Sequence, residues 1–86
     1  AIKIMINFKG VSYLSVSGLR LLIKIKHELL NICKENPNRE YAFILTNLNE
    51  GVKKIFQNIE LEDYFDIFED TKAFQRILLE KKYEFP

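Results

Sequence analysis

The chain has 86 residues, which favours a single domain with a small core. It is 48% hydrophobic and 29% charged, with three Gly and two Pro, a composition that excludes a collagen-like repeat, a disordered segment and a disulfide-rich scaffold. The formal net charge of +1 gives no overall attraction to nucleic acid or to an acidic membrane surface.

The charges are unevenly distributed along the chain. Residues 1–58 hold nine Lys or Arg and four Asp or Glu, whereas residues 59–86 hold four and eight. Such an asymmetry can orient a partner without identifying it. Cys33 has no second cysteine to pair with, so we expect a reducing, cytoplasmic location. No apolar run approaches the roughly 20 residues of a membrane span, so we expect no membrane insertion.

The first predicted element is a strand over residues 2–8. Ile2, Ile4 and Ile6 alternate with more polar positions, which is the period of an extended chain. Because Met5 is apolar as well, we expect the strand to be covered on both faces. A glycine and a short connection follow.

A long amphipathic helix is predicted next, over roughly residues 17–34. Ser15 and Ser17 are the candidate N-caps, because a hydroxyl there can accept a bond from an unpaired helix N–H. At about 100° per residue, six side chains share one polar arc. They are Arg20, Lys24, His27, Glu28, Asn31 and Lys34. Lys26 interrupts the apolar side, and we expect its stem to extend to water.

The alternation of strand and helix then continues to the end of the chain. Tyr41–Thr46 is apolar enough for a strand covered on both faces, and Glu50–Asn58 is a short helix. A short strand over residues 65–68 precedes a last helix capped by Asp70 or Thr71, and residues 83–86 are expected to fray. Asn49 is the predicted N-cap of the short helix.

The predicted order is therefore β-α-β-α-β-α, an α/β class with a small, largely parallel sheet flanked by helices. In such sheets the functional loops gather at the carboxyl ends of the strands. Those loops are residues 9–17, 47–49 and 69–70.

No residue pattern indicates an enzyme, a metal site or a cofactor. His27 lies on the polar arc without an acid or nucleophile spaced to serve it, and Cys33 lies on the apolar side. The acidic residues between 60 and 70 lack the glycine and terminal glutamate of a calcium loop. The three glycines are isolated, so no phosphate-binding loop is present.

Residues 11–22 are the most informative stretch. A strand leads into a turn with three serines and a glycine, and a helix begins there. Helix N-termini favour anions, and an exposed hydroxyl at such a place changes the local charge sharply if it is phosphorylated. On the residues alone, simple capping by these serines is the favoured interpretation, because the pattern is about as common as helix starts.

This stretch resembles the STAS family, the domain of bacterial anti-sigma-factor antagonists, stressosome subunits and the cytoplasmic tails of sulfate-type anion transporters. Residues 11–22 line up without gaps with the family pattern Val-Ser-Phe-Ile-Asp-Ser-Ser-Gly-Leu-Gly-Val-Leu. Residues 42–56 resemble the family's next strand and its Ser-Pro-Ala-Val-Lys-Arg-Leu-Phe helix. Residues 61–68 and 70–78 resemble its last strand and closing helix.

The resemblance implies a non-enzymatic module for signalling and the regulation of transcription, which docks an anti-sigma factor, a switch kinase or another STAS-type scaffold. The implied docking surface comprises Ser15, Val16, Ser17, Gly18, Arg20, Lys24, His27, Asn47 and Asn49. In phosphorylated members the acceptor directly follows an Asp; here that position is Val16, which carries no hydroxyl, and the Asp is replaced by Ser15. Ser15 and Ser17 are the possible substitute acceptors. The resemblance therefore favours constitutive docking over a phospho-switch.

Family members usually begin with two more strands and a helix. Residues 1–86 are therefore expected to form a single STAS-like domain that corresponds to the C-terminal two-thirds to three-quarters of the usual one. The first strand is then expected to have an open edge, which favours a homodimer through that edge. The alternative is a regulatory domain or fragment of a larger transporter, stressosome-type scaffold or enzyme. Nucleic-acid binding through the basic first half is a weaker alternative, which no aromatic and basic surface stripe supports.

Overall fold

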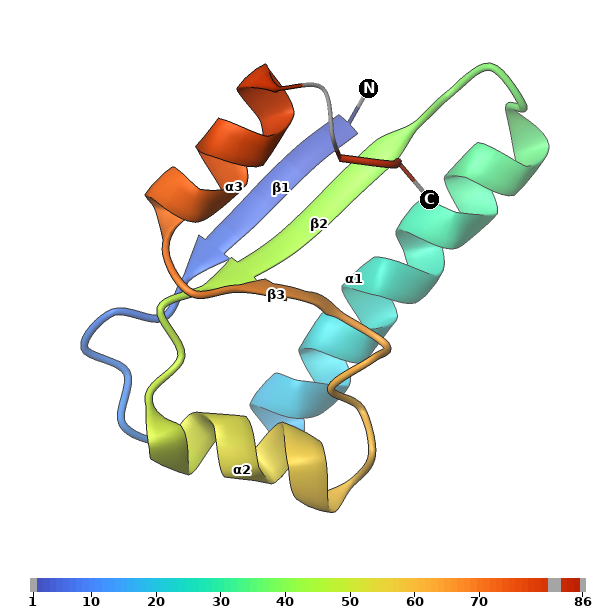
Figure 1. Cartoon of the computed structure of the whole chain (residues 1–86). Helices are drawn as coiled ribbons and strands as arrows, with labels where there is room; N and C mark the ends of the chain where they lie inside the picture. Colours follow the sequence, from blue (N-terminus) through green and yellow to red (C-terminus); the bar gives the residue numbers. More distant parts are fainter. Residues whose placement is uncertain (1, 81–82, 86) are drawn as a thin grey trace.

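The structure, a computed structural model, describes residues 2–80 and 83–85. Within them, strands and helices alternate in the predicted order (Figure 1). The elements are β1 (Ile2–Asn7), α1 (Val16–Glu35), β2 (Tyr41–Thr46), α2 (Glu50–Asn58), β3 (Asp66–Phe68) and α3 (Thr71–Leu79). The predicted α/β class and element order are confirmed.

The three strands form one parallel sheet in the order β1-β2-β3. Ile4 is paired with Phe43, and Ile44 is paired with Asp66. All residues of β2 are buried, as its uninterrupted apolar sequence predicts. Among the described residues, β2 is therefore the central strand and β1 and β3 are the outer ones.

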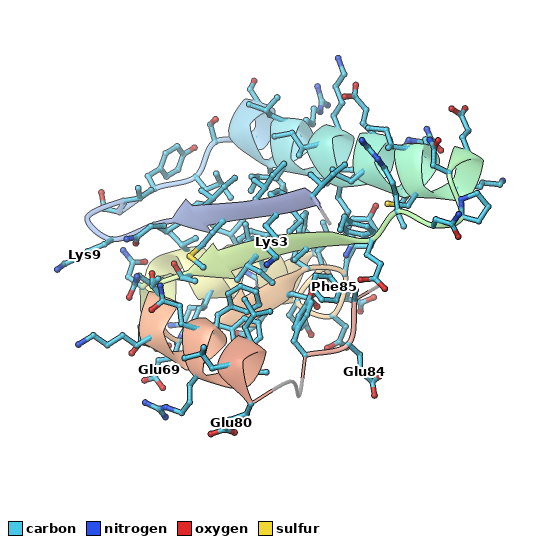
Figure 2. The ribbon with its side chains drawn as sticks, turned by 90° about the horizontal axis from the view of Figure 1, so that it is seen from above. Lys3, Lys9, Glu69, Glu80, Glu84 and Phe85 are labelled. Atoms are coloured by element: carbon cyan, nitrogen blue, oxygen red, sulfur yellow. The ribbon has the colours of Figure 1, made fainter. Side chains whose placement is uncertain are left out.

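Helices cover both faces of the sheet. Figures 1 and 2 show α1 and α3 on opposite sides of the strands. Two right-handed crossovers that advance in the same direction place α1 and α2 on one face. The core on that face includes Leu22, Leu29, Tyr41, Phe43, Leu45, Val52, Phe56 and Phe65. The smaller core on the other face is built from Ala42, Ile44 and Phe74.

Each helix begins at a side-chain cap. The Oγ of Ser15 accepts a hydrogen bond from the Gly18 N–H at 3.0 Å, so α1 starts at Val16. Of the two predicted serine caps, the structure uses Ser15, because Ser17 already lies inside the first turn. Asp70 caps α3 through a 2.7 Å bond from the Ala73 N–H. The capping oxygens satisfy N–H groups that have no partner within their own helix.

The prediction that the first strand is covered on both faces is wrong. Burial alternates along β1, with Ile2, Ile4 and Ile6 half-buried and Lys3 exposed. Met5 keeps 36% of its surface exposed. The reason is position: a strand at the edge of a sheet lacks the flanking side chains that shield a central strand.

Lys26 was expected to reach water, and the structure corrects this prediction. Its Nζ donates a hydrogen bond to the carbonyl of Tyr64 and lies 4.7 Å from the Tyr64 ring centroid. Burial lowers the pKa of Lys26, and the negative charge of Asp66 partly offsets that shift. The ammonium is therefore held by a carbonyl and an aromatic face, which ties α1 to the segment before β3.

The prediction that the tail frays is wrong for residues 83–85. The Tyr83 hydroxyl donates to Asp66 Oδ2 at 2.6 Å, and its ring lies edge-on to Phe74 at a centroid distance of 5.2 Å. Phe85 packs in turn on Tyr83, and both contact the smaller core. Pro86 lies outside the described residues. Aromatic burial and one hydrogen bond to a carboxylate therefore fix the tail against the α3 face.

Tyr83 should make the stability of the fold sensitive to alkaline pH. Its pKa is raised well above the ordinary value of 10.0, first by burial and then by its hydrogen bond to Asp66 and the charge of that carboxylate. Above pH 10 the unfolded chain releases the tyrosine proton while the folded chain retains it, so the folded state loses stability as pH rises. We expect the difference in Tm between wild type and Tyr83→Phe to narrow as the pH is raised from 9 to 11.

The comparison of the two proteins isolates Tyr83, since Lys26 and Tyr41 titrate in both. Tyr13→Phe is the matched control, because Tyr13 is 72% exposed. A Tm difference for Tyr83→Phe that stays constant over this pH range would contradict the assignment.

Candidate functional site

The turn before α1 is built by local contacts that fix its shape. The N–H of Val11 bonds the carbonyl of Phe8 at 2.9 Å, and the chain then continues without regular secondary structure to the cap at Ser15, whose backbone is extended. A Cβ on Gly18 would lie 3.1 Å from Leu14 Cδ1 and 3.3 Å from the Ser15 oxygen. A glycine at position 18 thus lets Leu14 pack closely beneath the first turn of the helix.

Four of the predicted residues form one exposed row on α1, which we call the α1 stripe: Val16, Arg20, Lys24 and His27. Their spacing of four, four and three residues places them on the same side of the helix. Val16 is 65% exposed although it is β-branched and apolar. The stripe therefore starts with an apolar side chain and continues with basic and imidazole groups in solvent.

The predicted residues Ser15, Ser17 and Gly18 adjoin the start of the stripe. Ser17 is exposed beside Val16, whereas the Ser15 oxygen is engaged by the Gly18 N–H. These residues and the α1 stripe together span residues 15–27, from the N-cap of α1 to just past its middle.

Asn47 and Asn49 have structural contacts of their own. Asn47 adopts a positive φ of 58°, and its Nδ2 donates to Asn7 Oδ1 at 2.9 Å. Asn49 caps α2 through a 2.8 Å bond from the Val52 N–H and donates to the carbonyl of Val11 at 2.9 Å. The two asparagines thus join the end of β2 to the end of β1 and to the turn before α1.

An open hollow of about 710 Å³ lies at the carboxyl ends of the strands. Its lining comprises Asn7, Lys9, Gly10, Asn47, Leu48, Lys53, Glu69, Asp70, Thr71 and Lys72. Figure 2 shows Lys9 and Glu69 at this end of the molecule. Of the residues predicted for the docking surface, Asn47 alone lines the hollow, and no residue of the α1 stripe does.

The predicted loops 9–17, 47–49 and 69–70 all contribute to the hollow, but sequence reasoning missed Asn7, Lys53 and Lys72. Asn7 could have been found, because it ends a strand whose carboxyl end meets that of the next parallel strand. Lys53 and Lys72 give no such signal, since each lies within a helix whose orientation depends on tertiary packing.

The described residues include no group of His, Cys, Asp and Glu side chains placed to hold a metal ion. His27 is exposed on the α1 stripe, and Cys33 is half-buried against the larger core. Within the same residues, no helix combines the length and apolar character needed to cross a membrane.

A family model described as STAS domain matches residues 2–73 of the chain. The match includes the turn, the α1 stripe and both asparagines. No curated protein and no solved structure matches the chain.

Asn49 should prove to be a structural residue with two separable contacts. Asn49→Ala removes the α2 cap and should cost about 1 kcal/mol of the free energy of unfolding. Asn49→Asp retains the capping oxygen but loses the amide that donates to Val11, so it should be less destabilising. Urea unfolding measures the first effect, and hydrogen exchange of residues 11–14 measures the second. Equal destabilisation by the two variants would contradict this division.

Proposed function

The chain belongs to the STAS domain family, whose members are regulatory domains related to the anti-sigma-factor antagonists, and we propose that it acts as a non-enzymatic protein-interaction module. In this proposal a regulatory protein docks on the turn formed by Ser15, Val16, Ser17 and Gly18 and on the α1 stripe. The partner would be an anti-sigma factor, a switch kinase or another STAS-type scaffold, in the cytoplasm.

The observation that carries the proposal is the exposure of Val16. Val16 is 65% exposed and lies in line with Arg20 and Lys24, so this surface offers a partner an apolar contact beside two positive charges. Burial of the apolar group stabilises a complex, while the cations set the orientation and the rate of encounter. A partner that presents an apolar pocket beside carboxylates fits this surface.

The preorganised backbone of the turn also supports docking. The Ser15 cap and the close packing of Leu14 on Gly18 hold Val16 at the first position of a regular helix. A partner that binds there does not have to order a mobile loop, which lowers the entropic cost of association.

Charge reversal on the stripe should weaken binding of the partner. Arg20→Glu and Lys24→Glu replace exposed cations without touching the core, and each should lower affinity on the order of tenfold, which corresponds to about 1.4 kcal/mol. Lys34→Glu is the matched control, because it makes the same charge change at the far end of α1. The measurement is capture from a lysate of the native cell, followed by titration of the captured protein.

We expect the Lys34→Glu variant to retain a regulatory protein that the two stripe variants lose. Equal binding by all three variants would place the docking surface elsewhere.

Docking should be independent of serine phosphorylation. Val16 offers no hydroxyl at the position that matches the family's acceptor, and the Ser15 oxygen already caps α1. We expect mass spectrometry to find no stoichiometric phosphate on the wild-type chain after incubation with ATP and a serine kinase of the family's switch type. Val16→Ser restores the hydroxyl and should become phosphorylated. Stoichiometric phosphate on any wild-type serine between residues 12 and 17 would contradict constitutive docking.

A further inference from the structure

We propose that the pocket between α2 and the loop before β3 receives an arginine side chain of a partner protein. The pocket has a volume of about 230 Å³, which is below the roughly 300–1,000 Å³ of sites for drug-sized ligands. It therefore suits one long side chain better than a cofactor. No residue of the α1 stripe or of the turn before it lines this pocket, so the inference goes beyond the proposed function.

The least exposed part of the lining is apolar. Phe56 is fully buried, and Ile67 is half-buried against the larger core. Lys53 and Gln57 line the pocket beside Phe56, because residues three and four apart share one face of α2. Such a lining can bury the methylene stem of a long side chain while the charged end stays at the rim.

Two carboxylates complete the lining. Glu62 and Asp63 are exposed neighbours in the loop before β3. In the part of the chain that the structure describes, no lysine or arginine lies within ion-pair distance of either one. The cation of the lining, Lys53, is paired with Glu50 at 3.5 Å instead. The pocket thus combines an apolar interior with two carboxylates that have no cation of their own.

A guanidinium fits this combination better than an ammonium does. Its planar fork of N–H donors can bond two carboxylates at once, and such charge-assisted bonds are the strong kind. It is also more weakly hydrated, so it loses less when it is placed beside an apolar wall. The charge of Lys53 is partly offset by Glu50, which reduces its repulsion of a bound cation.

Contacts within the chain fix the loop that carries the two carboxylates. Figure 1 shows the chain leaving α2 and turning back towards β3. The N–H of Leu61 bonds to the carbonyl of Phe56 at 2.9 Å, which holds the start of the loop against α2. At the other end, the carbonyl of Tyr64 accepts a hydrogen bond from Lys26. A pocket with a fixed wall loses less conformational entropy when it binds a side chain.

The distribution of charge favours a basic segment of a partner as the source of the arginine. Both carboxylates belong to residues 59–86, which hold eight Asp or Glu and four Lys or Arg. A basic segment is attracted to this part of the chain before contact, and the arginine then fixes its position. Ile59, 43% exposed at the C-cap of α2, offers an apolar contact to the rest of that segment.

Titration of the whole chain with N-acetyl-arginine methylamide, followed in amide NMR spectra, tests the pocket. We expect saturable shifts at Gln57, Glu62, Asp63 and Ile67, with a Kd on the order of 1 mM. The citrulline analogue has the same shape without the charge and should bind about tenfold more weakly or less. Equal binding of the two analogues, or shifts that avoid these four residues, overturns the proposal.

Charge removal tests the role of the two carboxylates. Glu62→Gln combined with Asp63→Asn keeps the size of both exposed side chains and should weaken binding of the arginine analogue about tenfold. Glu60→Gln is the matched control, because it removes a neighbouring charge that does not line the pocket. Unchanged affinity in the double variant, or an equal loss in the control, overturns the proposal.

Two further measurements identify the source of the arginine. Free L-arginine that binds more tightly than the blocked analogue would make the pocket a small-molecule site. Self-association in sedimentation that the double variant abolishes would make the occupant a second copy of the chain. Either result overturns the assignment to a partner protein, and we expect neither. Failure here leaves docking on the α1 stripe untouched, because no stripe residue lines the pocket.

Discussion

The burial of β2 is the constraint on which the rest of the structure depends. All its residues are inaccessible to solvent, and its side chains point alternately to both faces. A strand of this kind must be paired on both edges and covered on both sides. Its buried backbone N–H and C=O groups need hydrogen-bond partners, and its apolar side chains are stabilised by removal from water. The other elements of the chain supply that pairing and that cover.

Covering β2 on both sides produces two cores of unequal size. Two helices serve the larger core, while α3 serves the smaller one. A short helix alone covers little apolar surface, and the aromatic tail extends that cover through Tyr83 and Phe85. The hydrogen bond from Tyr83 to Asp66 then joins the tail to the start of β3, so a segment with no regular secondary structure contributes to the core.

The same arrangement distributes the possible contact surfaces around α1. One flank of this helix holds Lys26 against Tyr64, and Leu21 is exposed on another flank. The α1 stripe lies away from the sheet, where Val16 begins a row of basic residues. A single 20-residue helix therefore separates a core contact from the proposed docking surface for a partner. Because the two use different sides of the helix, a partner can dock on the α1 stripe while Lys26 keeps its contact with Tyr64.

The sequence by itself determined the element order, the strand β2 and the bounds of α2, because these depend on local patterns. An uninterrupted apolar run, the period of the helices and capping residues such as Asn49 and Asp70 act within a few neighbouring residues. The same local signals placed Ser15 and Gly18 at a helix start, and the family pattern gave Val16 its significance.

Only the tertiary structure decided the contacts between residues far apart in the chain. The exposure of Met5 depends on whether another strand lies beside β1, and the place of the Lys26 ammonium depends on a carbonyl 38 residues away. The packing of the tail depends on the Asp66 carboxylate 17 residues earlier, to which the Tyr83 hydroxyl donates a hydrogen bond. None of these contacts leaves a periodic trace in the sequence, since each requires the sheet and both cores to be in place first.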